Sequence, residues 1–224
     1  MQNWEYKKLG DVAKLKGGKR IPKGKKLLTT ITKHPYIRVT DFTDDGTVSL
    51  EDIHYISDDI FETIKQYTIT TEDVFISIAG TIGKVGIVPK ELDNANLTEN
   101  ACKLVLNENV YNKYIEYVFQ SDKVKDITKS NARANAMPKL SLTRLAEIEI
   151  PLPPLEEQKR IVKILDEKFA QLETLKANAK ANFQNAKDLF QSQLTKAFSN
   201  TTWEKKDWGM CVYKNKTKNG KMNK

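Results

Sequence analysis

Apolar side chains in the first 150 residues occur in short runs bounded by turn residues. The runs are rich in β-branched residues, which predicts strands. They lie at 36–39, 74–78, 85–88 and 103–106. Residues from Tyr111 to Thr128 instead show apolar positions at helical spacing, which predicts a helix. Because strands and helices do not alternate regularly, we expect an α+β domain over residues 1–150 rather than a doubly wound sheet.

The pattern changes at residues 151–154, where three of four residues are proline. Proline cannot continue a strand ladder or a helix interior. Glu156 and Glu157 follow at the start of a new segment, and acidic side chains are favoured in the first turn of a helix. No proline or glycine recurs before Gly209, so we expect one helix from about Leu155 to Ser199.

This helix carries apolar residues at alternating steps of three and four, a spacing near 3.5 that is typical of coiled coils. Lys168 interrupts the series, and Phe169 beside it can substitute. At 1.5 Å per residue the rod would be roughly 65–70 Å long, too long to bury its stripe on one domain. No turn signal favours a helical hairpin, so we expect a partner helix from outside. The residues expected to contact it are Ile161, Leu165, Leu172, Leu175, Ala179, Phe183, Ala186, Phe190 and Leu194.

Charge suggests the kind of partner. Lys and Arg number 37 against 29 Asp and Glu, a net charge of +8. Such an excess favours DNA phosphates through counterion release, although anionic lipid or an acidic protein would also fit. Two cysteines and two histidines predict neither a disulfide framework nor a metal site, and Cys102 fits a core position. Without an apolar leader or a long apolar span, we expect a soluble, cytoplasmic protein.

Three segments are candidates for DNA contact. The first, Lys14 to Lys26, has seven cations and no acid, and its glycines and proline predict a loop. A solvated charged loop is the alternative. Its candidate contacts are Lys14, Lys16, Lys19, Arg20, Lys23, Lys25 and Lys26.

The second segment is the glycine-containing turn at 79–84, where Thr81 and Lys84 can hydrogen-bond; a plain hairpin is the alternative. It lacks the glycine–lysine spacing of a phosphate loop, so we expect no nucleotide or other cofactor. The third is 131–137, where Arg133 has the side chain to pair with guanine and Asn135 with adenine. Arg38 and Thr40 are weaker candidates.

Several motifs of the chain occur together in one known family. The run IEIPLPPLEEQKRIV at 148–162 joins the end of the predicted domain to the start of the long helix. Trp4-Glu5 with Leu9-Gly10-Asp11-Val12 stands at the start of the domain, ISIAGTIGKVG lies at 76–86, and LTENAC at 97–102 and MPKLS at 137–141 follow. Together these motifs resemble the specificity subunits of Type I restriction–modification systems. In that family they correspond to the junction between target-recognition domain and helix, the domain start, the central strand–turn–strand and the positions that follow it.

A complete subunit of that family resembles two such units in tandem, whereas this chain has one. TWEKKDWG at 202–209 repeats NWEYKKLG at 3–10, which suggests that 201–224 is a truncated second start, expected to be mostly disordered. The resemblance implies a DNA-recognition domain at 1–150 and, at 151–200, a spacer helix that docks methyltransferase subunits and, through them, the restriction subunit. It also implies a homodimer that reads a bipartite palindrome.

The residues argue against one other class of function and leave a second one open. An enzyme is not expected, because neither an amino-methylation motif nor a nucleophile elbow is present. The alternative to a DNA reader is a coiled-coil assembly or exchange factor that binds an intact specificity subunit or its methyltransferase without selecting a sequence.

Overall fold

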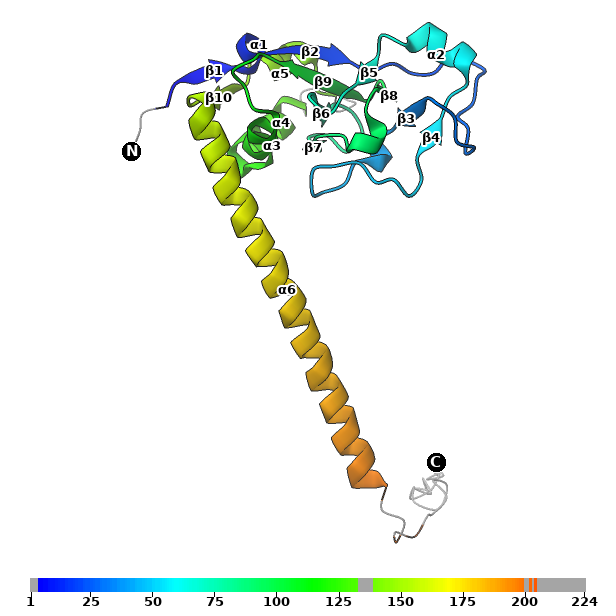
Figure 1. Cartoon of the computed structure of the whole chain (residues 1–224), viewed down its shortest axis with the longest axis vertical. Coiled ribbons are helices and arrows are strands. Elements are labelled where there is room, and N and C mark those ends of the chain that lie inside the picture. Colours follow the sequence, from blue (N-terminus) through cyan, green and yellow to red (C-terminus); the bar gives the residue numbers. More distant parts are fainter. Residues whose placement is uncertain (1–3, 133–138, 200–201, 203, 205–224) are drawn as a thin grey trace, which may run out of the picture. The chain divides into compact units, whose positions relative to one another are not determined.

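The computed structural model describes residues 4–132, 139–199, 202 and 204. The chain divides into two compact units, Met1–Lys168 and Phe169–Lys224 (Figure 1). The first unit is a mixed α/β domain together with the first turns of the last helix. The second unit, where it is described, consists mainly of the remainder of that helix. This confirms the predicted fold class.

The elements of the first unit are short. The strands are β1 (Tyr6–Lys8), β2 (Ala13–Gly17), β3 (Pro35–Ile37), β4 (His54–Tyr55), β5 (Thr68–Ile69), β6 (Val74–Ser77), β7 (Val85–Gly86), β8 (Ala95–Leu97), β9 (Ala101–Leu106) and β10 (Glu149–Pro151). The helices are α1 (Leu9–Val12), α2 (Asp58–Ile64), α3 (Asn112–Gln120), α4 (Asp122–Ala132), α5 (Leu142–Ala146) and α6 (Leu155–Phe198), with 3-10 turns η1 (Val39–Asp41) and η2 (Lys90–Leu92).

Two four-stranded sheets and one strand pair organise the domain. The first sheet has the order β2-β9-β6-β7 and is antiparallel throughout. The second has the order β4-β3-β8-β5, in which only β3 and β8 run parallel. β1 pairs with β10, so the N-terminal strand closes against the strand that precedes α6 (Figure 1). The main core packs α1, α3, α4 and α5 with the first sheet.

The predicted helix from Tyr111 to Thr128 is wrong as a single element. The structure has α3 and α4 instead, separated at Ser121, whose backbone is extended. The Ser121 hydroxyl donates a 2.6 Å hydrogen bond to the carbonyl oxygen of Val118, and its N–H caps the same turn. A serine that bonds nearby backbone groups competes with helix continuation. The break therefore comes from a side-chain contact without a proline or glycine.

The base of α6 is fixed by one buried amide. Gln158 is fully buried, and its Oε1 accepts from the Tyr111 N–H at 2.9 Å. Its Nε2 donates to the carbonyl oxygens of Pro153 at 2.8 Å and Asn109 at 3.1 Å. Val162, one turn on, is buried in the main core. The Leu-Glu-Glu-Gln motif thus joins the helix start to the loop before α3.

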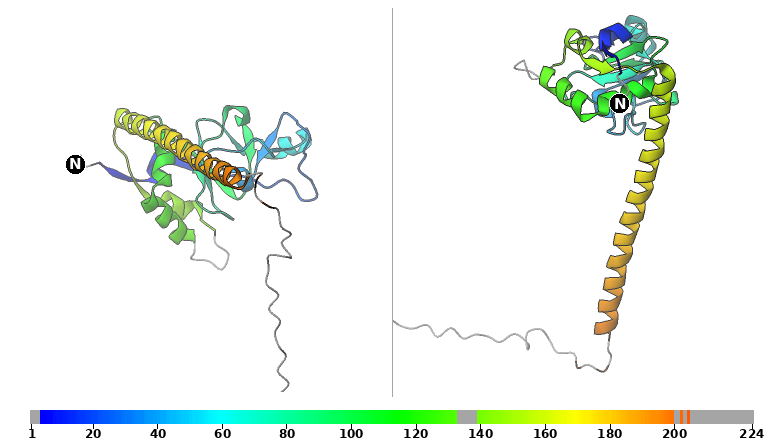
Figure 2. Two further views of the ribbon diagram at one scale, coloured as in Figure 1. Left: turned by 90° about the horizontal axis from the view of Figure 1, so that it is seen from below. Right: turned by 90° about the vertical axis from the view of Figure 1, so that its left-hand side faces the viewer.

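α6 is a single helix of 44 residues, which confirms the predicted long helix (Figure 2). Ile161 packs against the main core, and Leu165 lines an apolar cavity with Trp4 and Tyr6. Farther along, the stripe residues are exposed: Leu172 by 56%, Phe183 by 64% and Phe190 by 66%. Leu175, Ala179 and Ala186 are exposed as well, and Leu194 is partly exposed. Among the described residues, every helix is too short or too polar to cross a membrane.

Cys102 lies in the core, and burial raises the pKa of its thiol to about 12. Since the thiolate is the reactive form, the native thiol is expected to be inert. A Cys211→Ser variant should therefore react with Ellman's reagent at pH 8 only after addition of denaturant. The absorbance of released thionitrobenzoate measures this. Rapid reaction of the native variant would mean that Cys102 is accessible.

Candidate nucleic-acid interface

Two of the three candidate segments begin at one edge of the first sheet. β2 and β6 both run toward the start of β9, because Gly17 lies opposite Cys102 and Ser77 opposite Ala101. The first segment, Lys14 to Lys26 (the basic segment), continues from β2 beyond this edge. The 79–84 turn follows β6 at the same edge. The sheet register therefore brings together segments that are some 60 residues apart in sequence.

The basic segment is fixed to the edge at Gly18. Its N–H donates to the Ala101 carbonyl at 2.9 Å, and the Lys19 N–H donates to the Leu97 carbonyl at 2.8 Å. A Cβ at Gly18 would lie 2.1 Å from the Thr98 carbonyl oxygen, so only glycine fits. The Tyr36 hydroxyl also donates to the Lys19 carbonyl, at 2.9 Å. This close approach fixes where the loop begins.

The predicted loop over Lys14 to Lys26 is wrong in its first part. Residues up to Gly17 belong to β2, and the loop starts only at Gly18. In β2 the side chains of Lys14 and Lys16 are exposed while those of Ala13 and Leu15 face inward. This is the period-two alternation of a half-buried strand, which the cluster of charges obscured.

The basic segment also has counter-charges that its own sequence lacks. The Arg20 Nε lies 2.5 Å from the Glu99 Oε1, and the Lys25 Nζ lies 2.7 Å from the Asp59 Oδ2. The hydrogen bond from Lys25 lowers the pKa of Asp59 to about 2. Both acids come from distant parts of the chain. Within the described ranges, Lys14, Lys16, Lys23 and Lys26 have no ion pair.

The 79–84 turn is tightly fixed. Gly80 and Gly83 adopt φ of 74° and 88°, which glycine tolerates without strain. The Ser77 hydroxyl donates to the Thr81 carbonyl and accepts from the Lys84 N–H. The Lys84 ammonium donates to the Phe42 carbonyl at 2.7 Å and lies 3.1 Å from the Asp44 Oδ1. Lys84 thus connects the turn to the loop after η1, whereas Thr81 is exposed.

Arg133 and Asn135 lie outside the described residues. The positions flanking them are described. Lys139 forms an isolated bridge with Ala79, and the Leu140 N–H donates to the Ile78 carbonyl at 2.9 Å. On the other side, Thr128 of α4 lies near Gly83, 3.7 Å from the position of an added Cβ. The flanks of the third segment therefore meet the same edge as the other two.

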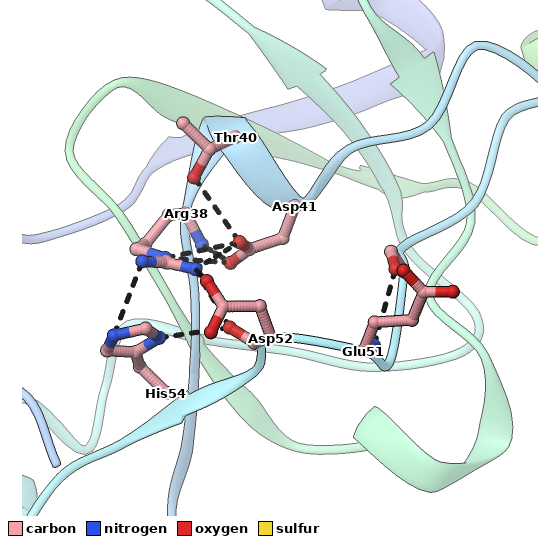
Figure 3. Close-up of polar contacts among 7 residues, drawn as sticks. Arg38, Thr40, Asp41, Glu51, Asp52 and His54 are labelled. Atoms are coloured by element: carbon pink, nitrogen blue, oxygen red, sulfur yellow. Dashed lines mark hydrogen bonds and ion pairs between the residues drawn. The ribbon is translucent and has the colours of Figure 1, made fainter. Parts of the chain in front are cut away.

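Arg38 forms ion pairs with acidic side chains of its own domain (Figure 3). Its guanidinium donates to the Asp41 carboxylate at 2.7 Å and to the Asp52 carboxylate at 3.0 Å. The hydrogen bond to Asp41 raises the pKa of Arg38, and the hydrogen bond from Arg38 lowers the pKa of Asp52. Thr40 also donates to Asp41. These bonds stabilise η1 directly after β3. The strand β3 ends at Ile37, whereas the sequence predicted a strand that continues to Val39.

Sequence reasoning missed a cavity beside the edge. It has a volume of about 300 Å³ and lies between the two sheets. Gln66, Tyr67 and Lys103 line it together with Lys16 and Gly18. The sequence features that could have indicated this cavity are the alternating cations on β2 and the single lysine on β9. Their mutual register is not readable from sequence.

The chain belongs to the family described as Type I restriction modification DNA specificity domain, whose sequence model matches residues 1–185. A Type I restriction enzyme EcoBI specificity subunit of Escherichia coli is 28% identical over 163 residues, covering 72% of this chain and 34% of the relative. A putative MjaX specificity subunit of Methanocaldococcus jannaschii is 26% identical over 215 residues, covering 93% of this chain and 49% of the relative.

Solved structures share the fold. The crystal structure of an HsdS subunit from Thermoanaerobacter tengcongensis matches with a TM-score of 0.68 at 19% identity, covering 92% of this chain and 52% of that one. A chain from work on assembly and conformational transition of the type I R-M system matches with a TM-score of 0.69 at 22% identity, covering 88% and 46%. The chain thus spans about half the length of these matched proteins or less.

Proposed function

We propose that the first unit recognises a DNA sequence as the target-recognition domain of a Type I restriction–modification complex. The observation that carries this proposal is that the first two segments, and the residues that flank the third, meet at one sheet edge. Lys19 begins the basic loop at this edge, and Thr81 is an exposed hydroxyl on the adjacent turn. Lys23 and Lys26, farther along the same loop, supply further positive charge. Phosphate contacts position such a protein on DNA, while base contacts provide specificity. Arg133 and Asn135 remain the proposed base readers.

We further propose that the second half of α6 pairs with the same helix of another copy. Its exposed apolar stripe supports this, because such a stripe on a long helix is normally covered by another helix. Two copies related by a two-fold axis would present two recognition domains and read a bipartite palindrome. The proposed role is non-catalytic: the dimer directs methyltransferase subunits and, through them, a restriction subunit. Residues 201–224, of which only 202 and 204 are among the described residues, remain a proposed second start.

Methylation-pattern sequencing tests the proposal. A host that supplies the methyltransferase subunit is compared with and without the gene for this chain. We expect a new or altered methylated motif whose two halves are inverted copies. An Arg133→Ala variant should methylate additional related sequences, because losing a base contact relaxes specificity at that position. An unchanged methylation pattern would instead favour the assembly or exchange factor.

A further inference from the structure

The cavity between the two sheets has an unusual charge arrangement. Lys16 on β2 and Lys103 on β9 are directly opposite each other in the antiparallel register. Side chains at directly opposite positions point to the same face, and two like charges there repel. Both lysines line the cavity, which lies beside the edge where the basic segment begins.

One buried acid compensates only one of these cations. The Asp73 carboxylate is 2.8 Å from the Lys103 ammonium, and it also accepts hydrogen bonds from the N–H and hydroxyl of Thr70. All three of these contacts are made to its Oδ2, and none of them involves Lys16. Lys16 has no acidic partner in the part of the chain that the structure describes. The cavity thus holds a net positive charge.

Other donors surround the same space. The Lys19 ammonium lies over the Tyr67 ring, 5.7 Å from its centroid, which places a third cation beside the cavity. Gln66 lines the wall, and within the described ranges its side-chain amide makes no hydrogen bond. Gly18 also lines the cavity, and its lack of a Cβ lets the loop backbone pack against the Leu97 and Thr98 carbonyl groups. Cations and an amide around a partly polar cavity are suited to an oxyanion.

We propose that this cavity binds a phosphate of the DNA backbone through Lys16, Lys19 and Gln66. This assignment rests on the proposed function and adds to it that phosphate binding and base reading are carried out by different residues. The cavity holds the sugar–phosphate chain whatever the bases are, and base reading is assigned to other residues, those of the 79–84 turn together with Arg133 and Asn135. Lys103 is not assigned a phosphate contact, since its ammonium is bound to Asp73.

The test uses the full chain with Lys16→Gln, which removes the charge and keeps a hydrogen-bonding group. Lys16→Arg restores the charge. Lys90→Gln is the matched control, because Lys90 lies in η2, away from the edge where the basic segment begins. The chain leaves that edge along β7 and returns to it along β8, and η2 lies between these two strands, at their far end. Fluorescence anisotropy measures binding to a duplex with the methylated motif and to a shuffled duplex at several salt concentrations.

For Lys16→Gln we expect affinity to fall about threefold to tenfold on both duplexes, and the slope of log K against log salt to decrease by about one. Lys16→Arg should recover binding, and Lys90→Gln should change neither value. In a second arm, inorganic phosphate at matched ionic strength should raise the melting temperature of the unchanged chain more than that of Lys16→Gln.

The other outcomes each overturn the proposal. Equal effects of Lys16→Gln and Lys90→Gln would mean that DNA affinity depends on the overall charge of the protein and not on this cavity. A loss confined to the motif duplex would make Lys16 a base reader. Protection by phosphate with unchanged DNA binding would assign the cavity to a free anion. If the unchanged chain bound neither duplex, the proposed function itself would fail, which the phosphate arm distinguishes from failure of the cavity.

Discussion

A Leu172→Glu/Phe183→Glu variant is expected to sediment as a monomer at concentrations where the unchanged chain is a dimer. The two side chains are 56% and 64% exposed in the single chain, so pairing of α6 would bury them. Burying one large apolar side chain stabilises by about 1.5–3 kcal/mol, and a two-fold dimer buries four of these. The loss of roughly 6–12 kcal/mol would weaken dimerisation by at least about 10⁴-fold.

Analytical ultracentrifugation at micromolar concentration measures this, with Asn185→Glu as the matched control. Asn185 is two residues beyond Phe183 and therefore about 160° around the helix from it. The control adds one of these two negative charges, on the polar face, and should remain dimeric. If the unchanged chain were a monomer both alone and with the methyltransferase subunit, pairing through α6 would be ruled out.

Lys103→Gln is expected to lower the free energy of unfolding by about 3–5 kcal/mol, because it leaves a buried carboxylate without its cation. The Asp73 side chain is only 6% exposed and the Lys103 side chain 14%. A Lys103→Gln/Asp73→Asn double variant should recover much of the loss, since two neutral amides can hydrogen-bond in the same place.

Urea denaturation followed by tryptophan fluorescence measures the change. Lys65→Gln removes a lysine from an exposed ion pair with Glu62 and serves as the control, with little expected effect. A Lys103→Gln variant as stable as Lys65→Gln would show that the Lys103–Asp73 ion pair does not contribute to stability.

The long helix was predictable because its signal is local. Proline ends the preceding segment, acids begin the helix, and apolar residues then recur at one spacing over 44 residues. The break between α3 and α4 was not predictable from sequence, because serine is tolerated inside helices. Only the hydrogen bond from Ser121 to Val118 shows that this serine ends α3. The strand Ala13–Gly17 was missed because the glycines and the proline of the basic segment were interpreted as making all of Lys14 to Lys26 a loop.

The candidate interface was predictable only as separate segments. Nothing in the sequence indicates that Gly17 lies opposite Cys102 or that Ser77 lies opposite Ala101, yet these registers bring the segments together. The counter-charges Glu99 and Asp59 were missed for the same reason, since they are far from Arg20 and Lys25 in sequence. Charge counted over a local window overstated how many cations are available to DNA.

The attachment at Gly18 has a consequence for how such a protein changes its target over time. Backbone hydrogen bonds from Gly18 to the first residue of β9 and from Lys19 to the last residue of β8 fix the first residues of the loop, and none of these bonds depends on a side chain of the loop itself. Residues such as Lys23 and Lys26 can therefore be exchanged, or the loop lengthened, without disturbing the sheet beneath. Selection for a new DNA target can then act on the loop while stability stays nearly constant.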